Sequence, residues 1–225
     1  MAIKPILFNT EMVRAILDGR KTCTRRILKG AIPFDEKAEY WNVLKKGEWS
    51  GPICVEYFIK QGSPYQPGDI LYVRETWHKY TKLVGKGEGC HLEEHYGYKA
   101  SIANSEDAEE PWKPSIHMPK KAARIWLKVT NVSVERLQEI TEAQTEEEGF
   151  LFTPPCLHRT GENYCDIDGP CGSKIKYCDM SVGELFGKVL WDSTIKKSDI
   201  DIYGWDANPW VWVIEFERCE KPKEV

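Results

Sequence analysis

Hydrophobic and polar positions follow two different periods along this chain, and each period predicts its own kind of element. Short apolar runs, several with alternating polar residues, predict strands at residues 6–8, 22–28, 53–59, 70–77, 125–134 and 211–216. Apolar residues at helical spacing behind polar capping residues predict helices at 10–19, 141–149 and 181–190. Many short strands with few helices predict an α+β, mainly β fold, a small barrel with helices packed outside it.

The remaining segments give a weaker signal. Residues 30–66 show no clear period, and residues 81–114 fit a long loop or a peripheral hairpin. A length of 225 residues favours one domain, so we expect residues 1–225 to form a single domain.

Charge is distributed unevenly along the chain. The net charge is −4, yet residues 1–30 hold seven basic and two acidic residues, and residues 111–134 hold five basic residues and no acidic one. Two basic blocks in an acidic chain are typical of a protein that contacts phosphates. Chance clustering on a solvated face is the alternative interpretation.

Other compositional features limit the class of protein. No apolar run approaches the roughly 18 residues that a membrane-spanning helix needs. The first residues lack the apolar region of a secretory signal peptide. We therefore expect a cytoplasmic protein with no membrane partner.

Four of the eight cysteines crowd into a short segment that is poor in apolar residues, at Cys156, Cys165, Cys171 and Cys178. Disulfides are uncommon in the reducing cytosol, whereas four thiolates suit a tetrahedral Zn²⁺. The spacing lacks the Cys-x2-Cys pairs of many zinc sites. We expect a structural zinc ion here, with free thiols in a loop or disulfides formed during purification as the alternatives.

Several motifs together resemble one known family. They lie at residues 4–8 (KPILF), 17–26 (LDGRKTCTRR), 67–77 (PGDILYVRETW) and 208–213 (NPWVWV). The chain resembles the ASCH domain family of the PUA-like superfamily, in particular its larger members from bacteriophages and prophages. This resemblance implies a β-barrel with flanking helices, with insertions at about 30–63, 81–115 and 151–180. It also implies recognition of RNA or a modified nucleoside.

One branch of that family is a bacterial N4-acetylcytidine amidohydrolase, which needs no cofactor for catalysis. Its catalytic lysine, threonine and glutamate are matched here by Lys21, Thr24 and Glu75. The chain is about twice as long as that small enzyme. The resemblance therefore implies a candidate amidohydrolase acting on N4-acylated cytidine.

The chemistry can also be stated from these residues alone. A threonine hydroxyl can attack an amide carbonyl if a desolvated lysine takes its proton. Residues three apart point to opposite faces of a regular strand, so Lys21 and Thr24 need a turn or bulge between them, which a loop after Gly19 would supply. Glu75 would hold the lysine in place or act as acid and base.

A structural interpretation of the same residues stays open. In it, Lys21 and Arg25 contact phosphates, Thr24 is an ordinary strand residue, and Glu75 is the buried ion-pair partner of Arg26 or Arg74. A ribonuclease and a non-catalytic, phage-encoded protein-interaction module are the functional alternatives.

Nucleic-acid recognition would use basic and aromatic side chains. The candidates for phosphate contacts are Arg25, Arg26, Arg74, Lys120, Lys121 and Arg124. The candidates for base stacking are Trp77, Tyr203 and Trp205. Trp205 lies in a loop rich in Gly, Asp and Asn, where we expect its side chain to be exposed.

Overall fold

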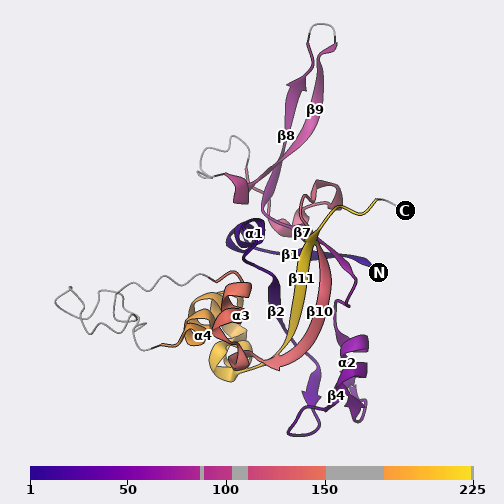
Figure 1. Cartoon of the computed structure of the whole chain (residues 1–225), viewed down its shortest axis with the longest axis vertical. Coiled ribbons are helices and arrows are strands. Elements are labelled where there is room, and N and C mark those ends of the chain that lie inside the picture. The colour runs from indigo at the N-terminus through magenta and orange to yellow at the C-terminus, as the bar shows by residue number, and fades with distance from the viewer. Residues whose placement is uncertain (87–88, 103–110, 151–179, 224–225) are drawn as a thin grey trace, which may run out of the picture. The chain divides into compact units, whose positions relative to one another are not determined.

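The computed structural model describes residues 1–86, 89–102, 111–150 and 180–223 (Figure 1). The chain divides into two compact units. The first unit comprises Met1–Thr22, Lys60–Val132 and Ile214–Val225. The second comprises Cys23–Ile59 and Ser133–Val213. Each unit therefore draws on segments that are far apart in the sequence, and each is described by itself.

The largest sheet has five strands in the order β1-β7-β10-β11-β2. The bounds are β1 Ile3–Leu7, β7 Ile70–Arg74, β10 Trp126–Arg136, β11 Trp210–Cys219 and β2 Cys23–Ile27. An α+β, mainly β fold is confirmed. The expected barrel is not: in the described part of the chain, the order ends at β1 and β2 without pairing these two edge strands to each other.

The first unit is built around β1 and β7, which pair in parallel with Ile3 opposite Ile70. The start of β10 pairs antiparallel with β7, with Trp126 opposite Tyr72. Helix α1 (Thr10–Leu17) connects β1 to the segment before β2. The described 3-10 turns of this unit include η2 (Lys99–Ser101), η4 (Ser115–His117) and η5 (Lys120–Ala122).

The sequence allowed either a long loop or a peripheral hairpin over residues 81–114, and the structure has a hairpin there. Its strands are β8 (Trp77–Val84) and β9 (His91–Tyr98), which pair with each other over their full lengths. The base of the hairpin packs into the core of the first unit, because Trp77 belongs to a buried cluster with Met118 and Trp126, and Tyr98 packs against that cluster. The hairpin is therefore anchored at its base by buried aromatic side chains.

The second unit contains a small sheet formed by residues for which the sequence shows no clear period. Its strands are β3 (Ala31–Pro33), β4 (Tyr40–Lys45), β5 (Glu48–Trp49) and β6 (Ile53–Cys54). A strand over 53–59 is wrong, because β6 ends at Cys54 and helix α2 (Val55–Gly62) follows. The helix buries Phe58, whose ring stacks on Trp41 at 4.9 Å between centroids. That contact favours the helix over an extended chain.

The helical part of the second unit follows β10. Its described elements are η6 (Leu137–Glu139), α3 (Glu142–Glu147), α4 (Val182–Leu185), the π-helix η8 (Phe186–Trp191), α5 (Asp192–Thr194), η9 (Lys197–Asp199), α6 (Ile200–Tyr203) and η10 (Trp205–Ala207). Its core gathers Leu137, Phe186, Trp191, Trp205 and Val213.

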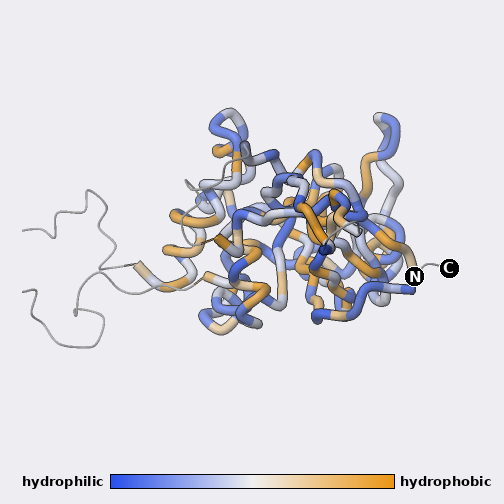
Figure 2. The backbone as a smooth tube through the Cα atoms, turned by 90° about the horizontal axis from the view of Figure 1, so that it is seen from above, coloured by the Kyte–Doolittle hydropathy of each residue, from blue (hydrophilic) through white to orange (hydrophobic). Residues whose placement is uncertain are grey.

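The predicted helix starts are confirmed by their caps. The side chain of Asn9 accepts a hydrogen bond from the Met12 N–H, and both Thr141 and Ser181 form reciprocal capping boxes. Along the backbone, short hydrophobic stretches are interrupted by hydrophilic residues (Figure 2). This pattern matches elements that bury one face and expose the other.

Candidate functional site

Lys21 is held at the end of helix α1 by the backbone. Gly19 adopts a left-handed conformation with a φ of 77°, which suits glycine because it has no Cβ. The N–H groups of Arg20 and Lys21 then both donate to the carbonyl of Ala15, at 2.9 and 3.0 Å. This turn directs the Lys21 side chain inward, where only 2% of the residue is exposed. The Lys21 Nζ lies 5.5 Å from the centre of the Phe8 ring.

Glu75 is a second buried charged residue of the same unit, directly after β7. Only 1% of it is exposed, and both carboxylate oxygens accept hydrogen bonds from Arg124. The Arg124 Nε to Oε1 distance is 2.8 Å and the Nη2 to Oε2 distance is 2.9 Å. This two-point contact fixes the plane of the carboxylate as well as its position. The ion-pair partner is Arg124, not Arg26 or Arg74 as the structural interpretation expected.

Arg124 is itself held by neighbours from the hairpin side of the unit. Its guanidinium carbon lies 4.1 Å from the centre of the Tyr98 ring, and Nη1 donates to the Ser101 hydroxyl at 2.6 Å. The Tyr98 hydroxyl donates to the carbonyl of Ala122 at 2.7 Å. Burial raises the pKa of Tyr98, and the Glu75 charge adds to this against the opposing effect of Arg124. Tyr98 and Ser101 both contact Arg124, and the sequence did not predict this because neither residue belongs to a recognisable motif.

Lys21 and Glu75 belong to the same region of the first unit. The ring under the Lys21 ammonium is that of Phe8, and the Phe8 N–H donates to the carbonyl of Arg74, the residue before Glu75, at 3.2 Å. We call Lys21, Glu75 and Arg124 the buried charged cluster, in which Lys21 and Glu75 are buried and Arg124 is half-buried. Two of the three predicted catalytic residues therefore lie in it, together with one predicted phosphate contact.

Thr24 belongs to the second unit and is 2% exposed within β2. Lys21 lies before that strand, in an irregular segment. The proposed chemistry requires a break in regular strand structure between Lys21 and Thr24, and this segment provides it. Three residues of extended chain span at most about 11 Å, which limits how far apart the two backbones can lie.

Arg25 is not available for a phosphate contact, since none of its side chain is exposed. Its Nη2 lies 3.3 Å from a carboxylate oxygen of Glu135 and its Nη1 lies 3.5 Å from one of Glu148. Glu148 also accepts the Arg25 backbone N–H at 2.6 Å. Arg25 therefore joins β2 to the residues around α3 inside the second unit. Arg26, next to it, is half-buried.

Two of the predicted stacking residues are buried instead of exposed. Trp77 and Trp205 are each 6% exposed, so neither indole offers a face to a base. Trp205 packs in the core of the second unit beside the backbone of Gly187, which leaves room for the indole. Tyr203 is half-buried, and its ring lies 4.8 Å from the Nζ of Lys29.

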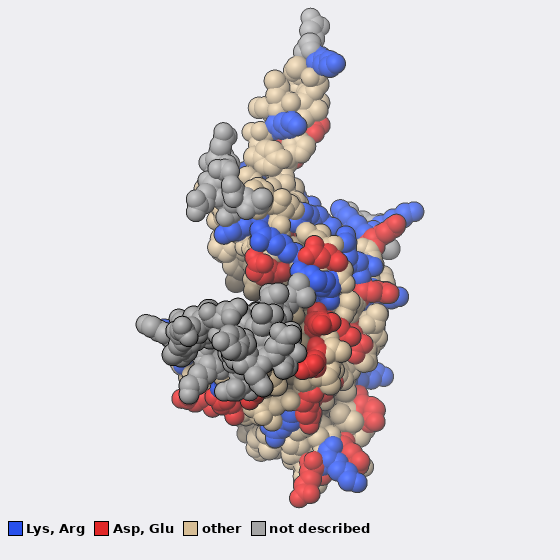
Figure 3. Space-filling view, turned by 60° about the vertical axis from the view of Figure 1, so that its left-hand side comes forward, with Lys and Arg blue, Asp and Glu red and all other residues tan. Residues whose placement is uncertain are grey.

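The remaining basic candidates lie in the first unit. Lys120 and Lys121 are exposed on η5, and Lys121 lies 3.8 Å from a carboxylate oxygen of Glu94. Arg74 is half-buried and donates to the carbonyl of Ile116. Figure 3 shows lysine and arginine side chains at the base of the β8–β9 hairpin with acidic side chains between them. The basic block at 111–134 is thus partly neutralised.

The four clustered cysteines, Cys156, Cys165, Cys171 and Cys178, lie outside the described residues. Among the residues that are described, no group of His, Cys, Asp and Glu side chains could hold a metal ion. The zinc site stays a prediction.

Comparison with known proteins identifies no relative: no family model, no curated protein and no solved structure matches this chain. Within the described part of the chain, none of the helices has both the length and the apolar character to cross a membrane.

Proposed function

We propose that this protein recognises RNA or a modified nucleoside as an ASCH-type member of the PUA-like superfamily, and that it hydrolyses the amide of N4-acylated cytidine. The observation that carries the proposal is the buried charged cluster. Lys21 and Glu75, which the family motifs nominate independently, are both withdrawn from water in one unit. Charged side chains are rarely buried without a structural or functional reason.

The proposed reaction gives each of the three residues a role. The Thr24 hydroxyl attacks the acyl carbonyl carbon while Lys21 accepts the hydroxyl proton. The C–N bond breaks, the proton passes to the departing N4 amine, and cytidine leaves. Water then hydrolyses the acyl-threonine ester, which releases the carboxylic acid and restores the hydroxyl.

Glu75 supports this chemistry as a positioning residue. Arg124 uses one lone pair of each carboxylate oxygen, and a carboxylate has about four acceptor sites. The remaining sites can accept from the lysine ammonium or from the N4–H of the nucleoside. Because Arg124 fixes the carboxylate plane, these acceptor directions are also fixed.

The test of the catalytic part is a turnover assay with matched variants. Wild-type protein is expected to convert N4-acetylcytidine to cytidine, followed by chromatography, and Lys21→Ala and Thr24→Ala are each expected to lose this turnover. Thr81→Ala and Lys82→Ala, at exposed positions of the hairpin, are the controls and should retain it. Equal rates in the Lys21 or Thr24 variants and the controls would exclude the assigned roles.

The recognition part is tested separately by binding single-stranded RNA over a salt series. Phosphate contacts make the logarithm of the affinity fall linearly with the logarithm of the salt concentration. A steep fall is expected. Absence of binding at low salt would rule out RNA as the ligand and leave the free nucleoside.

A further inference from the structure

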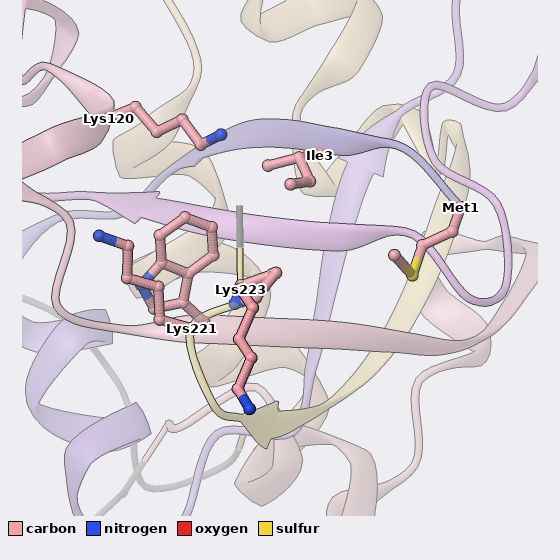
Figure 4. Close-up of a pocket in the computed structure, with 7 residues that line it drawn as sticks. Met1, Ile3, Lys120, Lys221 and Lys223 are labelled. Carbon is pink, nitrogen blue, oxygen red and sulfur yellow. The ribbon is translucent and has the colours of Figure 1, made fainter. Parts of the chain in front are cut away.

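The first unit contains a pocket of about 410 Å³, and none of the residues assigned above to catalysis is among its described lining residues (Figure 4). Three segments contribute to it: the start of the chain with β1, the η5 turn leading into β10, and the residues that follow β11. Its lining residues are Met1, Ile3, Lys120, Trp126, Lys221, Pro222 and Lys223. Sequence reasoning singled out only Lys120 as a ligand contact.

Among the described residues that line this pocket, the charged ones are all basic. Lys120, Lys221 and Lys223 are exposed, and within the described ranges none of the three has a carboxylate within ion-pair distance. Glu220 and Glu224 flank the Lys221–Lys223 segment in sequence. Glu220 is exposed and forms no described ion pair with the three lysines, and Glu224 lies outside the described residues. Ammonium groups that share a pocket repel one another, and a bound anion would relieve this repulsion.

The floor of the pocket is apolar. Trp126 is 4% exposed and packs against Tyr72 at 6.0 Å between ring centroids, so its position is fixed by the core. Ile3 is 40% exposed beside it, and Met1 and Pro222 complete the apolar lining. An apolar floor under a cationic rim suits a ligand that has both an apolar ring and several negative charges.

We propose that this pocket binds a nucleotide-type ligand that carries two or more phosphate groups. The three lysines would contact the phosphates, and the base or ribose would lie on the apolar surface that Ile3, Met1 and Pro222 expose beside the buried Trp126. Lysine is a common phosphate ligand, acting as a mobile point charge. The pocket volume lies within the range of about 300–1,000 Å³ typical of small-molecule sites. This site is independent of the proposed hydrolysis.

Two sources offer this chemistry: a free nucleoside triphosphate, and the phosphorylated 5′ end of an RNA strand. Calorimetric titrations with pyrophosphate, CTP, cytidine and a 5′-triphosphorylated oligonucleotide separate them. Pyrophosphate and CTP are expected to bind, CTP more tightly, and cytidine is expected to bind much more weakly. Tighter binding of the oligonucleotide than of CTP would assign the site to RNA ends, and the reverse would assign it to free nucleotides.

The variants test whether the pocket itself is responsible. Lys120→Gln, Lys221→Gln and Lys223→Gln combined should weaken CTP binding roughly a hundredfold, because two or more charge-assisted contacts are lost. The control is Lys60→Gln, Lys82→Gln and Lys86→Gln combined, which changes the net charge equally at exposed positions of the same unit. It should retain the wild-type affinity.

A second variant addresses the floor. Ile3→Glu places a carboxylate in the pocket and should abolish CTP binding, whereas Leu83→Glu, at an exposed position of the hairpin, should not. The proposal is overturned if CTP and pyrophosphate do not bind the wild-type protein, or if both triple variants lose affinity equally. Neither result bears on N4-acetylcytidine turnover, so the two proposals can fail separately.

Discussion

The ion pair between Glu75 and Arg124 allows a quantitative test of the buried charged cluster. Arg124→Met removes the guanidinium and leaves a carboxylate that is 1% exposed without its two donors. Breaking a fully buried pair in this way costs about 3–5 kcal/mol of unfolding free energy. Because 26% of the Arg124 side chain is exposed, we expect a smaller cost than for a fully buried pair, about 2–3 kcal/mol.

The matched change is Glu75→Gln, which keeps the shape of the side chain and one acceptor oxygen. We expect it to cost about 1–2 kcal/mol, since a neutral amide is cheaper to bury than a charge. The double variant should cost less than the sum of the two, with a coupling energy of about 1–2 kcal/mol. Urea unfolding followed by circular dichroism, with the midpoint and the slope both fitted, measures all three values.

Additive costs in this cycle would refute the reasoning, because they would mean that the two side chains do not depend on each other. So would an Arg124→Met variant as stable as the wild type. Arg124 also contacts Ser101 and Tyr98, so Ser101→Ala is the control for that part of the loss. It should cost no more than about 1 kcal/mol.

Three further predictions concern other parts of the molecule. Gly187→Ala should lower the unfolding free energy by about 1–3 kcal/mol, since the new Cβ would lie 2.0 Å from Trp205. The control is Gly183→Ala, whose new Cβ would have its nearest neighbour at 3.6 Å, and it should be neutral or stabilising. A thermal unfolding scan measures both variants. Burial alone would raise the pKa of Asp69, but hydrogen bonds from Lys4 and two backbone N–H groups outweigh it and lower the pKa below its ordinary value of 3.8. The stabilisation of the folded state by ionised Asp69 is complete above pH 3.8 and is lost as the pH falls through the lowered pKa. Asp69→Asn should therefore lower the unfolding free energy by about 1–3 kcal/mol at pH 7 and flatten the acid limb of a stability–pH curve. Metal analysis of protein purified without chelator should find about one zinc per chain, and four freely titrating clustered thiols with no zinc would contradict this.

Local sequence signals predicted the helix starts because capping is a local interaction. The Asn9, Thr141 and Ser181 caps each involve groups three residues apart, which the sequence displays directly. The strand predicted over 53–59 failed for the opposite reason. Its alternating apolar residues fit a strand, but the contact of Phe58 with Trp41 comes from another element and favours a helix.

The same distinction applies to the candidate site. The motifs indicated Lys21 and Glu75, and both lie in the buried charged cluster. The partner of Glu75, in contrast, is 49 residues away in sequence, and the partners of Arg25 are 110 and 123 residues away. A basic cluster in the sequence therefore does not show which of its members meet carboxylates inside the fold.

Exposure of aromatic side chains was equally hard to predict. The polar loop around Trp205 suggested a solvent-facing indole, yet the close approach to Gly187, 18 residues earlier, buries it. The Lys-Pro-Lys segment at 221–223 was a visible signal for a basic site. Its significance depends on Ile3 and Trp126, which only the fold brings to the same pocket.

The most direct test of the central proposal is the initial rate at which folded wild-type protein releases cytidine from N4-acetylcytidine, measured beside Lys21→Ala. We predict measurable turnover in the wild type and at least a hundredfold loss in the variant, because a general base typically contributes about 10²–10⁴-fold. Circular dichroism of both proteins checks that each is folded. No cytidine release by the folded wild type, or an unchanged rate in Lys21→Ala, would contradict the proposed function.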